Sequence, residues 1–243
     1  MTNDSYHAKE KYVGNVAAGY DDRRVEKPHW GREQAVVAGF IADIAARSTD
    51  ATVMDVPFGT GRYVDDYLAH GLNVIGADIS ADMIAAAADR MGAEIFGQLD
   101  VRVADAEHLP FANGAADAVV STRFIKWLPN LAVVENVIGE FARICPTGRM
   151  LIQVKVTADG GPQAGGVAAA IKRARWLLRD GVRTMLSAVV GREGKKTRRY
   201  HDGDMRAIFA RQGLTIVDVF DDEDESRAIR YYILENEGGA GRA

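Results

Sequence analysis

The chain has 243 residues, 47% of them hydrophobic and 26% charged, a formal net charge of −4 and one cysteine, Cys145. This length and composition predict one domain with a full core, and a single cysteine excludes an intramolecular disulfide. The acidic balance argues against nucleic acid as a partner, because overall charge would not attract it. The first residues lack a leader pattern and no apolar run reaches the roughly 18 residues of a membrane span, so we expect a cytoplasmic protein.

The first 50 residues show no strand pattern. Helices are predicted over 12–24 and 30–46, and the second has an apolar stripe that contains Val36, Val37, Phe40, Ile41 and Ile44. We expect residues 1–50 to form an N-terminal helical cap. Four of its side chains, Tyr20, Arg24, His29 and Trp30, are most simply ordinary packing and surface residues of a helix pair, and a lid over a ligand is the alternative.

Strands and helices then alternate, which is typical of a mainly parallel sheet with helices on both faces. Strands are predicted at 52–56, 73–78, 100–104, 116–121 and 150–156, and helices at 61–69, 81–91 and 131–144. Ser80 is a good N-cap for the helix at 81–91. The right-handed crossover rule places the five strands in one sheet, with a ligand site at their carboxyl ends.

The end of the first strand carries the most informative motif, Asp55-Val56-Pro57-Phe58-Gly59-Thr60-Gly61-Arg62. Glycines at such a turn let the backbone approach a ligand that a Cβ atom would exclude. Asp78 ends the second strand about 20 residues later, at the offset where an acid meets a ribose in dinucleotide folds. A dinucleotide site would need a small residue in place of Val64, and no Gly-Lys-Ser or Gly-Lys-Thr of a P-loop follows. The motif therefore predicts a nucleotide-type pocket of another kind.

Asp55, Gly59 and Gly61 match the acid and the last two glycines in the first motif of the class I S-adenosylmethionine-dependent methyltransferases, which this chain resembles. Pro57 replaces the first glycine of that motif. The resemblance implies an α/β, doubly wound, mainly parallel seven-stranded sheet that ends in an antiparallel hairpin, here 214–220 and 229–234. It also implies S-adenosyl-L-methionine as the cofactor.

Further contacts are implied by the resemblance at successive strand ends. Asp78 would accept hydrogen bonds from two ribose hydroxyls, with Ile79 and Met83 beside the adenine. Asp105 and Ala106 match the positions that bind the adenine amino group and a ring nitrogen, and Arg123 the position that touches the methionine end or the substrate. The complete cofactor set is Asp55, Pro57, Gly59, Thr60, Gly61, Arg62, Asp78, Ile79, Met83, Asp105, Ala106 and Arg123.

No catalytic residue is assigned from the sequence. His29, His108 and His201 are chemical candidates for a base, and each is more simply a surface or capping residue. Lys126 and Trp127 are candidates for the acceptor pocket, although Trp127 fits core packing equally well. Scattered histidines and one cysteine predict no metal site, and no serine sits in the G-x-S-x-G turn of a hydrolase.

Residues 157–202 are predicted to form a basic helical insert between the fifth strand and the last helix. Its part from Gly161 to Tyr200 holds ten basic and two acidic residues, a charge of +8. Such an insert can attract an anionic acceptor, rest on an anionic membrane, or be a solvated face that balances the acidic body. Residues 203–236 then complete the domain, with Asp202 as the expected cap of the last helix.

Two functions from different classes remain open. The first is methyl transfer to oxygen or nitrogen of a small-molecule or lipid-linked, anionic acceptor. The second is a non-catalytic module of the same fold that binds a partner or a membrane through the insert. The intact acid and glycine set favours the enzyme, while Val64 and the antiparallel ending argue against a nicotinamide-dependent oxidoreductase.

Overall fold

The computed structural model describes residues 28–157, 197–222 and 228–236. The predicted helix at 12–24 and the cap residues Tyr20 and Arg24 lie outside these ranges. So do most of the basic insert, the tip of the last hairpin and the C-terminal tail.

A seven-stranded sheet forms the centre of the protein, in the order β3-β2-β1-β4-β5-β7-β6. Its strands are β1 (Thr52–Asp55), β2 (Asn73–Asp78), β3 (Asp100–Val103), β4 (Ala118–Ser121), β5 (Arg149–Lys155), β6 (Leu214–Asp221) and β7 (Ile229–Asn236). The first five strands pair in parallel, whereas β7 is antiparallel to both β5 and β6. The predicted sheet and its antiparallel ending are confirmed.

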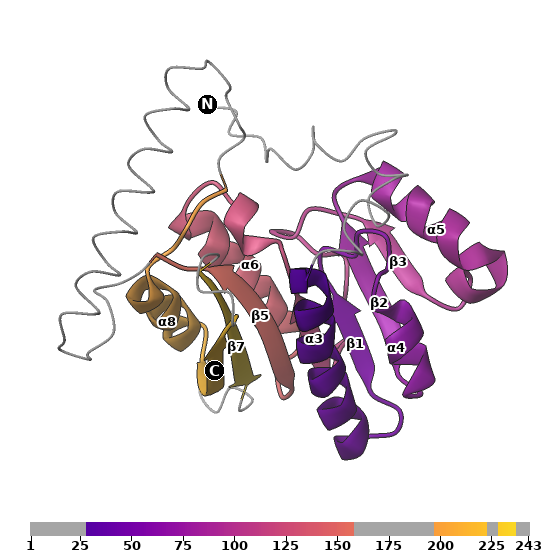
Figure 1. Cartoon of the computed structure of the whole chain (residues 1–243), viewed down its shortest axis with the longest axis horizontal. Coiled ribbons are helices and arrows are strands. Elements are labelled where there is room, and N and C mark those ends of the chain that lie inside the picture. Colours follow the sequence, from indigo (N-terminus) through magenta and orange to yellow (C-terminus); the bar gives the residue numbers. More distant parts are fainter. Residues whose placement is uncertain (1–27, 158–196, 223–227, 237–243) are drawn as a thin grey trace, which may run out of the picture.

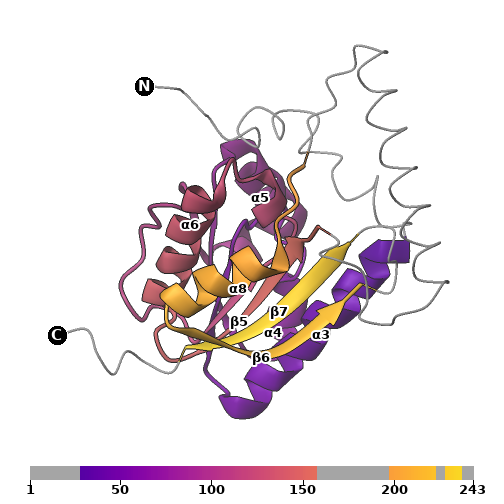
Figure 2. The same cartoon turned by 90° about the vertical axis from the view of Figure 1, so that its left-hand side faces the viewer.

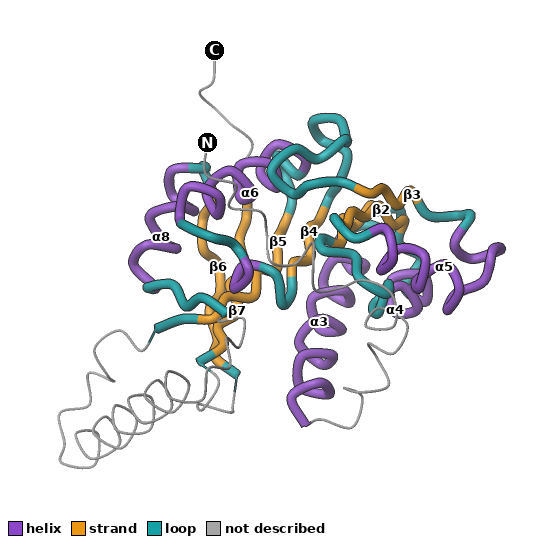
Figure 3. Tube along the Cα trace, turned by 90° about the horizontal axis from the view of Figure 1, so that it is seen from above, coloured by secondary structure: helices purple, strands orange, loops and turns teal. Residues whose placement is uncertain are grey.

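Helices cover both faces of the sheet (Figures 1 and 3). One face carries α3 (Pro28–Arg47), α4 (Val64–Ala69) and α5 (Ala81–Phe96), and the other carries α6 (Leu131–Ile144) and α8 (Asp202–Arg211). A short 3-10 turn, η1 (Ile125–Trp127), follows β4. Figure 2 shows the strands of the final pair side by side, with α8 on one side and α3 on the other.

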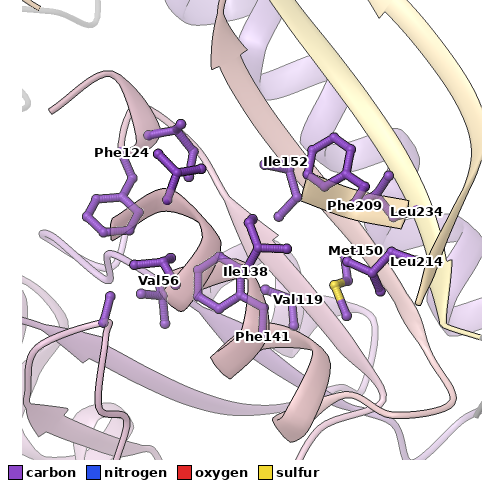
Figure 4. Close-up of a cluster of buried hydrophobic side chains, with 14 of the residues drawn as sticks. Val56, Val119, Phe124, Ile138, Phe141, Met150, Ile152, Phe209, Leu214 and Leu234 are labelled. Atoms are coloured by element: carbon purple, nitrogen blue, oxygen red, sulfur yellow. The ribbon is translucent and has the colours of Figure 1, made fainter. Parts of the chain in front are cut away.

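The strands alternate their side chains between two hydrophobic clusters, as the period of two in a strand requires. In β5, Met150 and Ile152 join the cluster under α6 and α8, whereas Leu151 joins the cluster under α3, α4 and α5. Phe141 of α6 and Phe209 of α8 are fully buried in the first cluster (Figure 4). Both faces are therefore dry, which explains why the central strands read as continuous apolar runs.

Several element ends differ from the sequence prediction, for example β4, which starts at Ala118 and not at residue 116. The helix expected from Gly61 starts only at Val64, because the residues before it form turns. Helix α5 runs past the predicted end at Met91 to Phe96, across the non-helical Gly92 with φ of 78°. His201, not Asp202, occupies the N-cap position of α8, and the Asp202 carboxylate instead accepts a hydrogen bond from the Tyr232 hydroxyl at 2.6 Å. Ser80 caps α5 as predicted, since its side chain accepts from the Met83 N–H.

The strand order reverses between β1 and β4, so the connections leaving these neighbours diverge at their carboxyl ends. In open α/β sheets this switch point is where ligands bind. Among the helices that the structure describes, none is both long and apolar enough to cross a membrane.

Candidate functional site

A pocket lies at the switch point, with about 910 Å³ of space including its open mouth. This is the size of a site for a nucleotide-sized ligand. Every predicted cofactor residue lines it except Gly61, and the predicted Trp30 and Trp127 line it as well. Sequence reasoning missed the lining residues Phe58, Tyr63, Thr122 and Phe124.

The glycine loop after β1 is fastened to the end of β2. The Phe58 N–H donates to the Ala77 carbonyl at 2.8 Å, and the Gly59 N–H donates to Asp78 Oδ2 at 2.8 Å. Gly59 has φ of +58°, a backbone conformation that strains any L side chain. The loop therefore exposes bare backbone to the pocket where a Cβ would narrow it.

The Phe58 ring packs between this loop and β2. A Cβ on Gly76 of β2 would lie 2.4 Å from Phe58 Cδ2, and a Cβ on Gly61 would lie 3.1 Å from the same ring. Both glycines are thus needed to make room for the Phe58 ring. Gly61 packs against this ring and Met91 and does not line the pocket. The role of Gly76 could not be predicted, because a glycine inside a strand indicates that another group lies close to the backbone but not which group it is.

Asp78 sits at the meeting point of β2 and the loop. Its Oδ2 accepts from Gly59, its Oδ1 accepts from the Ser80 N–H at 2.9 Å, and the residue is 8% exposed. Burial raises the pKa of its carboxyl, while the backbone N–H bonds act in the opposite direction. Each oxygen keeps a second lone pair, so two ligand hydroxyls can still be bound.

Beyond Asp78 the pocket becomes a largely apolar slot between the ends of β2 and β3. Ile79, Met83 and Ala106 line it, and Asp105 stands at its rim. Asp105 Oδ1 accepts from the Glu107 N–H at 3.1 Å, which fixes the turn after β3. A flat aromatic ring with a polar edge matches this combination of apolar walls and one acid.

Helix α3 closes the opposite side of the pocket. Arg62 lines the pocket as predicted, yet its guanidinium is held by α3: Nη1 donates to Glu33 at 2.7 Å, Nη2 to the Trp30 carbonyl at 2.7 Å and Nε to Gln34 at 3.0 Å. The guanidinium also stacks 3.5 Å from the centre of the Trp30 ring. Each of its three guanidinium nitrogens donates a hydrogen bond to α3, so Arg62 holds this helix against the loop after β1.

Glu33 is the centre of this wall, and the sequence analysis did not single it out. It is 4% exposed, accepts from the Tyr63 hydroxyl at 3.2 Å and accepts from Gln153 Nε2 at 2.6 Å. A signal was available: Glu33 lies four residues before Val37, on the apolar stripe of α3. A charged residue on a buried stripe requires buried partners, here from β5 and the loop after β1.

Arg123 follows β4 and lines the pocket beside Trp30. Its backbone has φ of 60°, and its N–H donates to Gln153 Oε1 at 2.7 Å. The Nε atom lies 3.4 Å from Glu33 Oε1, and the guanidinium carbon lies 4.8 Å from the centre of the Trp30 ring. Buried Nη1 has no hydrogen-bond partner among the described residues. Arg123 is therefore held in place with donor capacity to spare.

Comparison with known proteins agrees with this geometry. Residues 54–152 match the family described as a methyltransferase domain. A malonyl-[acyl-carrier protein] O-methyltransferase of Geobacter sulfurreducens is 30% identical over 179 residues, which cover 72% of this chain and 59% of the relative. The crystal structure of magnesium protoporphyrin IX methyltransferase from Synechocystis PCC 6803 with bound SAH has a TM-score of 0.68 at 16% identity, covering 93% of this chain and 96% of that one. Together these findings support a class I S-adenosylmethionine-dependent methyltransferase domain in this chain.

A second relative of this chain is the demethylmenaquinone methyltransferase of Thermobifida fusca, 30% identical over 122 residues that cover 50% of each chain. The chain thus spans between half and three fifths of the length of these curated relatives. The matched part coincides with the glycine loop, Asp78, Asp105 and Arg123, and leaves out Trp30 and Glu33 of α3.

The histidines named as candidate bases, His29, His108 and His201, do not line this pocket. His201 Nδ1 pairs with the Thr157 hydroxyl at 2.9 Å, outside the pocket. Trp127 lines the pocket, whereas Lys126 does not, and its carbonyl accepts from the Arg198 N–H at 2.8 Å. The described end of the basic insert is therefore attached directly behind the pocket wall.

Proposed function

We propose that this protein is an enzyme that binds S-adenosyl-L-methionine and transfers its methyl group to oxygen or nitrogen of an anionic, small-molecule or lipid-linked acceptor. The observation that carries the proposal is the pairing of two unlike halves in one pocket. A glycine loop and Asp78 form one half, and the arginine-bearing wall of α3 and β4 forms the other.

Cofactor binding is assigned to the first half. Asp78 accepts hydrogen bonds from the ribose hydroxyls, because both of its oxygens have a lone pair left after binding backbone N–H groups. Ile79, Met83 and Ala106 hold the adenine, with Asp105 at its amino edge. The bare backbone at Gly59 leaves room for the methionine end. When bound, the cofactor supplies a methyl group already activated by its positively charged sulfur.

The acceptor is assigned to the second half, between Trp30, Arg123 and Trp127. The basic insert leaves the described structure after Thr157 and returns at Thr197, and its two ends are joined by the Thr157 N–H, which donates to the Tyr200 carbonyl at 2.9 Å. The returning end lies beside η1, which supplies Trp127, because the Arg198 N–H donates to the Lys126 carbonyl at 2.8 Å. A segment of charge +8 fastened next to the pocket raises the local concentration of an anion.

The names of the relatives agree with such acceptors. One is named for a malonyl group carried by a protein and another for a quinone precursor. Peripheral contact of the insert with an anionic membrane would suit a lipid-linked acceptor. The alternative, a non-catalytic module, would leave the glycine loop and Asp78 without a ligand.

Titration calorimetry with S-adenosylmethionine, S-adenosylhomocysteine and NAD tests the cofactor. We expect micromolar binding of the first two ligands and none of NAD. Absence of binding to all three would support the non-catalytic module instead.

The insert is tested by replacing Arg175, Arg179 and Arg183 with glutamine. We expect weaker methyl transfer to an anionic acceptor, or weaker binding to anionic vesicles, with unchanged cofactor affinity. If neither activity nor vesicle binding changes, the insert is a solvated charged face and the acceptor assignment loses this support.

A further inference from the structure

The acceptor half of the pocket holds an excess of buried positive charge. Arg62 and Arg123 face one acid, Glu33, and the three side chains are only 11%, 13% and 5% exposed. Two cations and one anion give these three side chains a sum of +1, and the next buried acid of the pocket, Asp55, has a pKa raised by burial, which favours its neutral form. A buried charge without a counter-charge is costly, so a ligand that brings an anion to this place is favoured.

The two arginines are not equivalent. Arg62 donates a hydrogen bond to α3 from each guanidinium nitrogen. Arg123 forms an ion pair with Glu33 only through Nε, at 3.4 Å. Buried Nη1 of Arg123 has no hydrogen-bond partner in the described part of the chain. Buried donors are nearly always satisfied in the functional state of a protein, so Arg123 is the group that awaits an acceptor atom.

Arg123 is also presented in a fixed position. Gln153 binds its N–H through Oε1 and binds Glu33 through Nε2, and the Tyr231 hydroxyl accepts a further bond from Gln153 at 3.0 Å. Glu33 and Gln153 are therefore positioning residues for Arg123. A guanidinium held in this way offers parallel N–H donors, a geometry that suits a carboxylate.

The described lining of the pocket offers the acceptor no general base. It contains neither histidine nor lysine, and Asp78 and Asp105 stand at its opposite end, on β2 and after β3. Asp55 is 3% exposed beneath the glycine loop. The Tyr63 hydroxyl is bound to Glu33 and to Thr122, and burial raises its pKa well above 10, so it stays neutral. A nucleophile that reacts without losing a proton therefore fits this described part of the pocket.

We propose that the methyl acceptor is a free carboxylate, held by Arg123 and converted to a methyl ester. This inference rests on the proposed function and names its substrate class. A carboxylate is ionised at neutral pH, satisfies Arg123, neutralises the +1 cluster and needs no base. A phenol or a carbon acid would need one.

The reaction balances without any proton. One carboxylate oxygen attacks the methyl carbon in line with the carbon–sulfur bond, the O–CH₃ bond forms, and the electron pair of the broken bond stays on sulfur. The positive sulfonium becomes a neutral thioether, and the negative carboxylate becomes a neutral ester. The two opposite charges neutralise each other in this step. A pocket with little water accelerates it, because water stabilises the charged reactants more than the neutral products.

The test uses the full chain with S-adenosylmethionine labelled in the methyl group. Malonyl-CoA and suberate are the carboxylate probes, acetyl-CoA is the matched probe without a free carboxylate, and a catechol is the hydroxyl probe. We expect label on at least one carboxylate probe, released as volatile methanol by mild alkali, with no label on acetyl-CoA. No proton should be released per turnover, against one per turnover for a hydroxyl acceptor.

Arg123→Met should lower kcat/KM for the carboxylate probe by about 10- to 100-fold, mainly through KM, because a hydrogen bond to a charged group is lost. Its affinity for S-adenosylhomocysteine should stay within about twofold, and Arg123→Lys should restore part of the activity. Arg47→Met, at the exposed far end of α3, is the control and should change neither value.

Three results would overturn the inference. Labelling of the catechol but of no carboxylate would exclude this substrate class, as would S-adenosylhomocysteine binding with no probe labelled. An Arg123→Met variant that loses S-adenosylhomocysteine affinity would assign Arg123 to the carboxylate of the cofactor instead. Failure to bind S-adenosylmethionine at all would reject the proposed function itself, which separates the two failures.

Discussion

The two halves of the pocket are built in different ways. The half at β1, β2 and β3 is made by neighbours in the chain and by backbone groups, such as Gly59 N–H on Asp78 and Ser80 N–H on the same carboxylate. The half at α3, β4 and β5 is made by side chains from distant segments, with Glu33 and Gln153 separated by 120 positions. A site for a common ligand can be encoded locally, whereas a site for a particular acceptor is assembled by tertiary contacts.

The halves also differ in charge. Burial raises the pKa of both Asp55 and Asp78 on one side, while the other side holds two arginines around a single acid. The buried guanidinium groups would attract an anionic acceptor, whereas burial disfavours the negative charge on the two acids. Substitutions that affect one half and spare the other test this division, and the following four are ordered by expected effect.

The largest effect is expected from Glu33→Ala, which leaves Arg62 and Arg123 buried without their acid. Breaking such a buried cluster costs about 3–5 kcal/mol in the free energy of unfolding. Urea denaturation followed by circular dichroism measures it. Glu94→Ala, at an exposed position of α5, is the matched control and should change stability by less than about 0.5 kcal/mol. Equal losses in the two variants would show that the wall of α3 is not a coupled cluster.

Asp78→Ala should weaken S-adenosylhomocysteine binding by about 1.5–3 kcal/mol, because hydrogen bonds to a charged group are lost. Calorimetry gives this value directly, with the exposed Asp89→Ala of α5 as the control. Unchanged affinity would remove Asp78 from the cofactor half.

Gly76→Ala should destabilise the loop after β1, since its Cβ would lie 2.4 Å from Phe58 Cδ2 and the ring must move. Overpacking of this kind costs about 1–3 kcal/mol, and we expect cofactor affinity to fall with it. Gly39→Ala is the contrasting control, because nothing lies within 4 Å of its Cβ on α3. It should stabilise the helix by about 1 kcal/mol. A harmless Gly76→Ala would contradict the packing of the Phe58 ring between this loop and β2.

Asp55→Asn should change how stability depends on pH. The pKa of Asp55 is raised in the folded state above its usual 3.8, so the folded chain holds this proton to higher pH than the unfolded chain does. Stability is therefore lost as pH rises from about 4 through the folded pKa, by at most about 1.4 kcal/mol per pH unit for one proton. The variant should lose less stability between pH 4.5 and 8 in urea titrations. The exposed Asp89→Asn should keep the slope of the wild type, and a wild-type slope in Asp55→Asn would place the titration elsewhere.

The sequence by itself determined the five parallel strands and the glycine turn at the end of the first one, whereas the antiparallel ending was implied by the family resemblance. Apolar strand runs, the glycine turn and the acid at the end of β2 are local features, and local features survive without knowledge of long-range contacts. Gly61 is an instructive case: the motif predicted a cofactor contact, yet Gly61 does not line the pocket, and a Cβ there would lie 2.8 Å from Met91 Cε and 3.1 Å from the Phe58 ring.

Only the tertiary structure decided the acceptor half. No local sequence pattern around Glu33 predicts Arg62, Arg123 or Gln153 as its partners. Likewise, no local pattern around Gly76 predicts its contact with Phe58. Arg62 donates to α3 from all three of its nitrogens, whereas Arg123 approaches Glu33 of α3 through Nε alone, and its Nη1 has no hydrogen-bond partner among the described residues. Burial and distance determine the charge state of a side chain and the number of its hydrogen-bond donors that stay unused. Burial and distance are properties of the folded chain.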